Sequence, residues 1–300
     1  MLNSLPADSQ IQITDSPKEM ESERIKGTGD FGVNGTMGNR RYAVFLDIDD
    51  TLMSRGVLPQ KNIDAIARAR KLGNKVFLNT GRAYSFIPEK IMESIRFDGV
   101  VAGIGSYVRY GNEILRSITF TEKQLKMLVG HYLTTENQCH VEGETRMFYI
   151  HPRDPEGKTI IRSIDDFSVC YPDSRISKFS VDGRMTEEEK EMLADDFVCW
   201  QHENYYEFAR KGCNKASGMK VALDRLGWSR SASIAMGDSK NDIDMMKFAG
   251  ISIAMGNSPD RIKELCDDVT APALEAGVAV ALEKYVIPAS AKKAKKEESA

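Results

Sequence analysis

The chain has 300 residues, of which 41% are hydrophobic and 28% charged, and its formal net charge at pH 7 is −3. These values are typical of a soluble globular protein with one large domain or two smaller ones. The pI of about 5.9 argues against nucleic acid as a partner. No apolar run approaches the roughly 18–20 residues that a membrane-spanning helix needs, so a membrane role is not expected either.

The cysteines are scattered, odd in number and without metal-ligand spacing. Together with the lack of a signal peptide they predict a protein of the reducing cytoplasm. The four histidines form no HExxH pair, which argues against a histidine-based zinc site. The five cysteines are Cys139, Cys170, Cys199, Cys213 and Cys266.

Both ends of the chain lack apolar periodicity. Residues 1–40 are rich in Ser, Gly, Asp and Asn, and they are predicted to be a disordered leader. Residues 287–300 contain a lysine-rich run followed by two glutamates, which predicts a solvated, disordered charged tail.

Between these ends, short apolar runs alternate with helical patterns. The clearest helix repeats apolar residues from Met219 to Leu226 at the i, i+3, i+4, i+7 spacing. This alternation predicts an α/β fold, a Rossmann-like doubly wound parallel sheet, over residues 41–118 and 207–286. The predicted strands are Tyr42–Leu46, Lys75–Leu78, Gly99–Ala102, Ala232–Met236 and Ile251–Ala254.

Residues 119–206 show a different pattern, in which short strands and helices are mixed. Such mixing is typical of an α+β module with an antiparallel sheet. Because the first pattern resumes afterwards, this segment is predicted to be an inserted cap domain. Its predicted helices are Thr121–Thr134, Lys158–Ile164 and Thr186–Asp195, and its predicted strands are Cys139–Val141, Met147–Ile150, Ile176–Val181 and Phe197–Gln201.

Polar residues follow the predicted core strands. The run Asp47-Ile48-Asp49-Asp50-Thr51 comes after the first strand and Thr80-Gly81-Arg82 after the second. The fourth strand is followed by Gly237-Asp238-Ser239-Lys240-Asn241-Asp242. Carboxyl ends of neighbouring parallel strands converge on one crevice, so these groups can meet in space. Carboxylates at the edge of a core need a cation, and a hard divalent metal suits them.

Lys215 occupies the first turn of the predicted helix, where its charge opposes the helix dipole. A bound anion would explain that position, because the lysine and the backbone N–H groups would both point at it. Each feature alone also fits a turn, a helix cap or a solvated lysine. In this order at strand ends, however, the features together favour a site for a phosphate and a metal.

These motifs resemble the four motifs of the haloacid dehalogenase (HAD) superfamily of aspartate-nucleophile phosphotransferases. The matching residues are Asp47-Ile48-Asp49-Asp50-Thr51, Thr80, Lys215 and Gly237-Asp238-Ser239-Lys240-Asn241-Asp242. The likeness covers residues 41–118 and 207–286. The insert resembles the large α/β cap of the Cof-type sugar-phosphatase branch.

The resemblance implies a magnesium-dependent phosphatase that hydrolyses a small phosphomonoester, a sugar phosphate or a similar metabolite, through an aspartyl-phosphate. Asp47 would be the nucleophile and Asp49 the general acid and base. Mg²⁺ would be bound by Asp47, the backbone carbonyl of Asp49, and Asp238, with Asp242 supporting these ligands. The phosphoryl oxygens would be held by Thr80, Gly81, Lys215 and Asn241.

Two positions depart from the family pattern. Asp50 stands where the family often has glycine, and it is expected to face away from the metal. Ile104-Gly105-Ser106 follows the third strand, where the Cof-type pattern usually has Asn-Gly-Ala. If that asparagine contacts substrate in the family, its replacement weakens the inference of a sugar phosphate.

Other readings of the sequence stay open. A phosphomutase would use the same residues but return the phosphoryl group to a sugar. A non-catalytic phospho-ligand-binding protein is disfavoured by the intact Asp47 and Asp49 pair. A receiver domain is also disfavoured, because its acidic pair and its phosphorylated aspartate follow different strands, whereas the acidic residues here follow the same strand. The substrate and the choice between monomer and homodimer stay open too. Candidate specificity residues of the cap are Arg146, Tyr149, His151, Lys178 and Tyr206.

Overall fold

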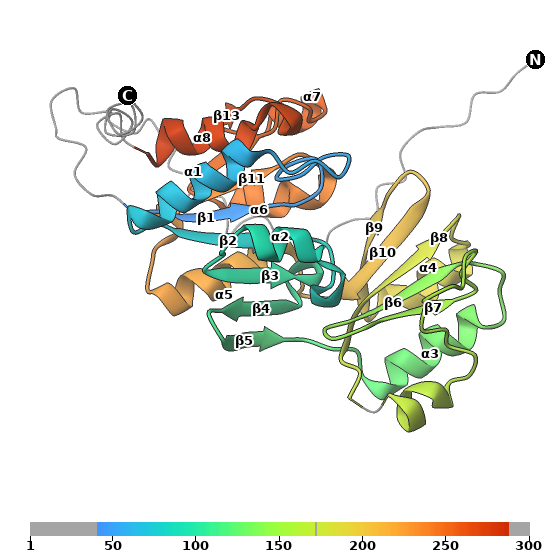
Figure 1. The fold of residues 1–300 in the computed structure, drawn as a ribbon. Helices are drawn as coiled ribbons and strands as arrows, with labels where there is room; N and C mark the ends of the chain where they lie inside the picture. Colours follow the sequence, from blue (N-terminus) through green and yellow to red (C-terminus); the bar gives the residue numbers. More distant parts are fainter. Residues whose placement is uncertain (1–40, 172, 288–300) are drawn as a thin grey trace, which may run out of the picture. The chain divides into compact units, whose positions relative to one another are not determined.

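The computed structural model describes residues 41–171 and 173–287. The predicted leader and nearly all of the predicted tail therefore lie outside the described residues. Within these ranges the larger sheet has eight strands in the order β13-β12-β11-β1-β2-β3-β4-β5 (Figure 1). Its strands are β1 (Ala43–Leu46), β2 (Lys75–Asn79), β3 (Gly99–Ala102), β4 (Tyr107–Tyr110), β5 (Glu113–Ser117), β11 (Ser233–Gly237), β12 (Ile251–Ala254) and β13 (Asp268–Val269).

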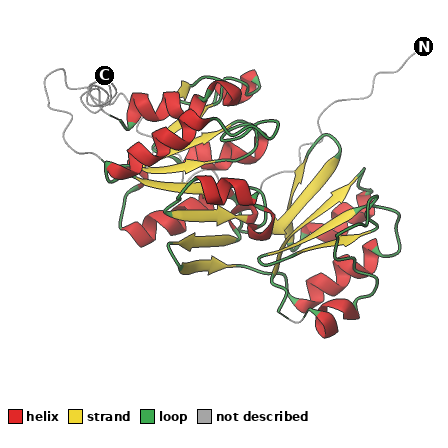
Figure 2. Cartoon of the chain, in the orientation of Figure 1, coloured by secondary structure: helices red, strands yellow, loops and turns green. Residues whose placement is uncertain are grey.

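Side chains of this sheet alternate between two apolar cores. On β1, Val44 and Leu46 belong to one core, whereas Ala43 and Phe45 belong to the other. Helices cover both faces, as expected for a doubly wound sheet (Figure 2). They are α1 (Gln60–Lys71), α2 (Glu89–Ser94) and α8 (Gly277–Tyr285) on the first face, α5 (Lys215–Leu226) and α6 (Ile243–Phe248) on the second, with α7 (Asp260–Lys263) beside β12.

The prediction of a parallel sheet missed β4 and β5, which pair antiparallel at one edge. Both strands are short, and β5 has no buried residue, so neither contains an apolar run long enough to indicate a core strand. The signal that could have revealed them is Gly111, which has a positive φ of 58° at the turn between the two strands. The core sheet is therefore mixed, with its parallel part around β1.

The second sheet has five strands in the order β7-β6-β8-β10-β9 and is antiparallel. Apolar side chains of α3 and α4 pack on one of its faces. The sheet includes β10, so it extends past residue 206, where the predicted insert ended. Its elements are α3 (Glu122–Tyr132), β6 (Cys139–Gly143), β7 (Met147–Ile150), β8 (Ile176–Asp182), α4 (Glu187–Ala194), β9 (Phe197–Gln201) and β10 (Tyr205–Arg210).

The predicted helix Lys158–Ile164 is wrong. The segment is extended, and Tyr149 of β7 pairs with it through a bridge to Ile160. The backbone of Tyr149 exchanges hydrogen bonds with Thr159 and Ile161 at 2.9 Å each. A helical turn follows only at Asp166–Cys170. Pairing with β7 decided the conformation here, because β-branched isoleucines suit an extended chain as well as a helix.

Asn62 connects three parts of the core from inside the protein. Its side chain accepts a hydrogen bond from the backbone N–H of Ala279 at 2.9 Å and donates one to the carbonyl of Leu52 at 3.3 Å. Because Asn62 is fully buried, Asn62→Ala leaves two backbone groups without partners. We expect this change to lower the free energy of unfolding by about 1–3 kcal/mol in urea denaturation.

Gln60→Ala is the matched control for this prediction. Gln60 is exposed on the same helix and also donates a side-chain hydrogen bond, but to Asp64 at the surface. Its removal should change the free energy of unfolding by less than about 0.5 kcal/mol. Equal losses for the two variants would contradict a structural role for the Asn62 contacts.

Candidate active site

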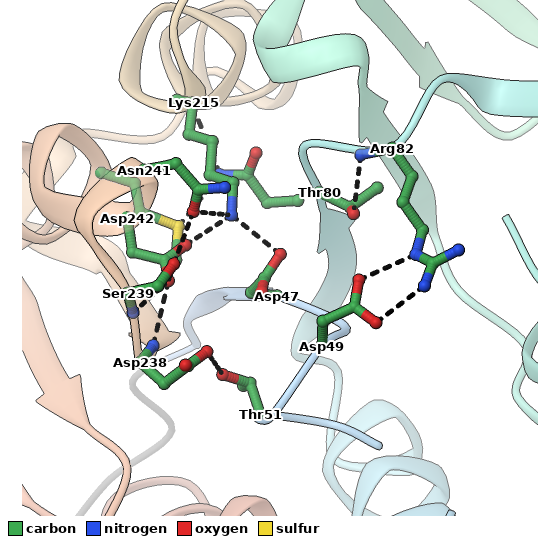
Figure 3. A network of polar contacts seen from close by, with 12 residues as sticks. Asp47, Asp49, Thr51, Thr80, Arg82, Lys215, Asp238, Ser239, Asn241 and Asp242 are labelled. Carbon is green, nitrogen blue, oxygen red and sulfur yellow. Dashed lines mark hydrogen bonds and ion pairs between the residues drawn. The ribbon is translucent and has the colours of Figure 1, made fainter. Parts of the chain in front are cut away.

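The polar residues that follow β1, β2 and β11 lie together because these strands are parallel neighbours. β1 pairs with β11 on one side and with β2 on the other. Asp47 follows β1 directly, and its backbone N–H still donates to Met236 of β11 at 3.1 Å. Figure 3 shows the side chains of Lys215 and Asp47 turned toward one another, with the Asp238 carboxylate below them and bonded to Thr51.

Lys215 is the fully buried cation of this group. Its ammonium donates to Asp47 Oδ1 at 2.8 Å, to Asp242 Oδ1 at 2.5 Å and to Asn241 Oδ1 at 3.1 Å. The helix itself is capped by Asn214, whose side chain accepts from the backbone of Ser217. The anion that explains a lysine in the first turn is thus provided by the protein's own carboxylates.

Asp242 fixes the loop after β11. Its Oδ2 accepts the backbone N–H groups of Asp238 and Ser239, each at 2.9 Å, while its Oδ1 accepts from Lys215. The side chain is fully buried, and its Oδ2 also accepts from the Ser239 hydroxyl at 3.3 Å. These contacts orient Asp238 and leave Asp242 engaged with the protein rather than turned outward.

Carboxylates outnumber cations at the centre of the site. One oxygen from each of Asp47, Asp238 and Asp242 lies within 4.8 Å of the others, and Lys215 is the ammonium partner of Asp47 and Asp242. Burial raises the pKa of Asp47 to about 7, in spite of Lys215, and Asp242 adds to the rise. Burial and the charges of Asp242 and Asp47 raise the pKa of Asp238 to about 8. The three carboxylates thus have only one ammonium among them, and their oxygen atoms are ligands that fit a hard divalent cation.

Asp49 points elsewhere. Its two oxygens accept from Nε and Nη2 of Arg82, at 2.8 Å each, and its side chain is about half exposed (Figure 3). Asp50 has a positive φ of 53° and accepts from the Ser54 hydroxyl, and it is not part of the carboxylate cluster. The three acidic residues that are adjacent in sequence therefore have three different environments.

Thr80 and Gly81 line the site from β2. Thr80 is buried, and its hydroxyl oxygen accepts the backbone N–H of Arg82 at 3.1 Å. A β-carbon on Gly81 would lie 3.3 Å from Nδ2 of Asn241. The predicted residues from three strand ends and from α5 are thus brought together, with Asp49 set apart by its ion pair.

A cavity of about 650 Å³ adjoins the site. Its lining includes Asp49, Arg82 and Asp238, and it continues along Asn257 and Leu274. The carboxylate of Asp238 is therefore accessible from this side, although Asp47 is buried. Water or an ion can reach the cluster through this opening.

Two polar contacts of the site were not predicted from the sequence. Thr51 donates its hydroxyl hydrogen to Asp238 Oδ1 at 3.0 Å, and Arg82 binds Asp49 as described above. Both residues belong to the motifs that follow β1 and β2, so the sequence indicated that they lie near the site. Their partners could not be read from these motifs, because each partner follows a different strand.

Among the described residues, no helix combines the length and the apolar character that crossing a membrane requires.

The arrangement defines an α/β protein with an acidic, lysine-bridged site at the carboxyl ends of parallel strands. The profile of the haloacid dehalogenase-like hydrolase family matches residues 44–282. The chain belongs to this family, which confirms the resemblance drawn from the sequence motifs.

Known proteins similar to this chain agree with that membership. "Putative phosphatase YkrA" of Bacillus subtilis is 28% identical over 80% of this chain and 96% of its own length. A phosphoglycolate phosphatase of Methanothermobacter thermautotrophicus is 25% identical over 81% of this chain and 98% of its own. A solved HAD-superfamily phosphatase of Bacteroides thetaiotaomicron superposes with a TM-score of 0.72 at 21% identity, covering 86% of this chain and all of that one. The last likeness supports the α/β fold with an added antiparallel sheet.

Proposed function

We propose that the protein is a magnesium-dependent phosphatase that hydrolyses a small phosphomonoester, a sugar phosphate or a similar metabolite, through an aspartyl-phosphate. The observation that carries the proposal is the buried Asp47 carboxylate, bound by Lys215 and followed two residues later by a second carboxylate, Asp49. The phosphatase names of relatives that align over most of this chain support it.

The reaction has two steps. A carboxylate oxygen of Asp47 attacks phosphorus, and the bond from phosphorus to the leaving alcohol oxygen breaks. Asp49 gives that oxygen its proton. Water then attacks phosphorus, Asp49 takes a proton from the water, and the bond between Asp47 and phosphorus breaks to release inorganic phosphate. For these tasks the Asp49 carboxylate must leave its ion pair with Arg82 and turn to the leaving-group oxygen. The side chain is about half exposed, which allows this movement.

Positive charge and hydrogen-bond donors hold the phosphoryl group. Four groups near Asp47 would bind the phosphoryl oxygens: Lys215, the Thr80 hydroxyl, the Gly81 backbone and the Asn241 amide. Asp47, the backbone carbonyl of Asp49, and Asp238 would hold Mg²⁺, which supplies the charge that lets a phosphate dianion approach a carboxylate.

Residues 41–118 and 207–286 would form the catalytic core, and the module after residue 118 would form a cap over it. The cysteines that the structure describes form no disulfide, which supports a reducing, cytoplasmic location. The protein would act on free metabolites as a monomer or homodimer.

Metal dependence gives the direct test. Hydrolysis of an aryl phosphate should require Mg²⁺ and stop on chelation. The metal should also raise the Tm, and more so at pH 8 than at pH 6. The reason is that the raised pKa values of Asp47 and Asp238, about 7 and 8, let protons compete with the metal at lower pH.

Asp238→Asn should remove most of this Mg²⁺-dependent rise in Tm. Asp244→Asn is the matched control, because Asp244 is a partly buried aspartate on α6 outside the carboxylate cluster. It should leave the rise intact. Aryl phosphate hydrolysis that persists in the presence of chelator would refute the metal assignment.

A further inference from the structure

Asn257 joins two loops of the core through the two ends of its side-chain amide. Its Nδ2 donates to the backbone carbonyl of Asp50 at 2.8 Å, and its Oδ1 accepts the backbone N–H of Ala273 at 2.8 Å. Asp50 belongs to the run after β1, whereas Ala273 begins the short turn Ala273–Glu275. Asn257 is exposed and lines the cavity together with Asp238, so its amide lies beside the carboxylate site rather than in an apolar core.

The backbone next to Asn257 is anchored to β11 and to a second loop. Met255 donates its N–H to the carbonyl of Gly237 at 3.1 Å, which continues the pairing between β12 and β11 beyond the end of β12. A β-carbon on Gly256 would lie 2.8 Å from the backbone nitrogen of Pro272, so this close approach requires glycine. The loop that carries Asn257 is therefore held in place independently of its side chain.

Asp50, the residue that Asn257 contacts, has an unusual backbone. Its φ of 53° lies in the left-handed region, which residues other than glycine adopt only where surrounding contacts hold them. Its carboxylate accepts from the Ser54 hydroxyl at 2.5 Å. The peptide between Asp50 and Thr51 is held at both ends, because its oxygen accepts from Asn257 and its N–H donates to the carbonyl of Ile48 at 3.3 Å.

This peptide lies between two of the proposed metal ligands. On one side it adjoins Asp49, whose backbone carbonyl is the proposed ligand from the run after β1. On the other side is Thr51, whose hydroxyl donates to Asp238 Oδ1 at 3.0 Å (Figure 3). Contacts that orient the ligands of a metal, without touching it, typically change its affinity by about 10–100-fold when they are removed.

We propose that Asn257 is a positioning residue of the metal site, which holds the peptide between Asp50 and Thr51 in the orientation that the ligands need. The inference rests on the proposed phosphatase function and adds a residue to the same site. Without the amide of Asn257, water becomes the partner of the Asp50 carbonyl and the peptide is free to rotate. The ligands on either side then have to be ordered when Mg²⁺ binds, which weakens binding.

Metal affinity, measured without turnover, tests the inference. The dependence of the Tm on Mg²⁺ concentration gives the Kd of the metal. For Asn257→Ala we expect this Kd to rise about tenfold. Asn257→Gln keeps an amide but carries it one methylene further, so it should raise the Kd in the same direction even if the alanine variant fails to fold. At saturating Mg²⁺ the KM of Asn257→Ala for an aryl phosphate should stay within about twofold, because the residue does not touch the substrate.

Asn74→Ala is the matched control. The side chain of Asn74 also joins two backbone groups, accepting from Tyr42 at 2.8 Å and donating to the carbonyl of Ala69 at 2.9 Å. It precedes β2 and therefore lies at the end of the sheet opposite to the site. Because Asn74 is buried and Asn257 is exposed, Asn74→Ala should lower the metal-free Tm more than Asn257→Ala does. Its Kd for Mg²⁺ should nevertheless stay within about twofold of that of the unmodified protein.

A double-mutant cycle tests whether Asn257 acts through the peptide that it holds. Thr51→Val removes the hydroxyl contact with Asp238 and should raise the Kd for Mg²⁺ by itself. Since both residues hold the same segment, the increase in the double variant should be smaller than the product of the two single increases. Independent, multiplicative increases would overturn the proposed connection.

The titrations distinguish this inference from the proposed function. If Mg²⁺ does not raise the Tm of the unmodified protein, the metal assignment fails and this inference fails with it. If the unmodified protein binds Mg²⁺ and hydrolyses an aryl phosphate, an unchanged Kd in Asn257→Ala overturns this inference alone. An equal increase of the Kd in Asn74→Ala also overturns it, because the effect would then be a general loosening of the fold.

Discussion

Asp47→Asn is expected to lower kcat for aryl phosphate hydrolysis by at least ~10³-fold, because an amide oxygen cannot attack phosphorus to form the acyl phosphate. The variant should remain folded, since asparagine has the same shape and its Oδ1 can still accept from Lys215. Its Tm in the absence of metal at pH 8 should be higher than that of the unmodified protein. The raised pKa of Asp47, about 7, means that ionising this group is unfavourable in the folded state.

Asp50→Asn is the control for this experiment. Asp50 is exposed and accepts from Ser54, outside the carboxylate cluster, and asparagine also tolerates its positive φ of 53°. Its kcat should change less than about threefold. Substantial turnover by Asp47→Asn, with mass spectrometry showing that asparagine is retained, would exclude Asp47 as nucleophile.

Lys215→Met should have the largest effect on stability. The change leaves Asp47 and Asp242 buried without their ammonium partner, and removing one member of a buried ion pair costs about 3–5 kcal/mol. The two carboxylates raise the pKa of Lys215 above its usual value. Its contribution is therefore complete below the unfolded pKa of about 10.4 and fades only as pH rises through the higher folded value. Urea denaturation at pH 7 without metal measures the full loss.

Lys220→Met provides the comparison within the same helix. Lys220 is exposed and pairs with Asp224 one turn away, so its removal should cost less than about 0.5 kcal/mol. Adding Asp242→Asn to Lys215→Met should restore part of the lost stability, because one unpaired buried charge disappears. A loss for Lys215→Met as small as that for Lys220→Met would show that the buried ion pairs do not stabilise the fold.

The polar residues at strand ends could be predicted from the sequence for a geometric reason. Parallel neighbours such as β1, β2 and β11 place their carboxyl ends at one edge, so Asp47, Thr80 and Asp238 had to lie close together once the strands were recognised. The family and the α/β fold predicted from these motifs are confirmed by the family match over residues 44–282. The individual catalytic roles stay predictions.

Other features depended on contacts between distant segments. The extended segment at Ile160 pairs with β7, and the edge strands β4 and β5 lack an apolar run. Tyr206, predicted as a specificity residue, packs in the apolar core of the second sheet. Local patterns are weak in each case, because short β-branched or half-exposed segments take the conformation of the neighbour that they pair with.

The run after β1 shows both sides of this division. The sequence by itself determined that three carboxylates follow a buried strand and require positive charge. Only the tertiary structure decided their different partners, because those lie far along the chain. Lys215, which binds Asp47, is 168 residues away, and Arg82, which binds Asp49, is 33 away. A strand period or helix spacing carries information over a few residues, whereas the partner of a buried charge is chosen by how the strands and helices pack.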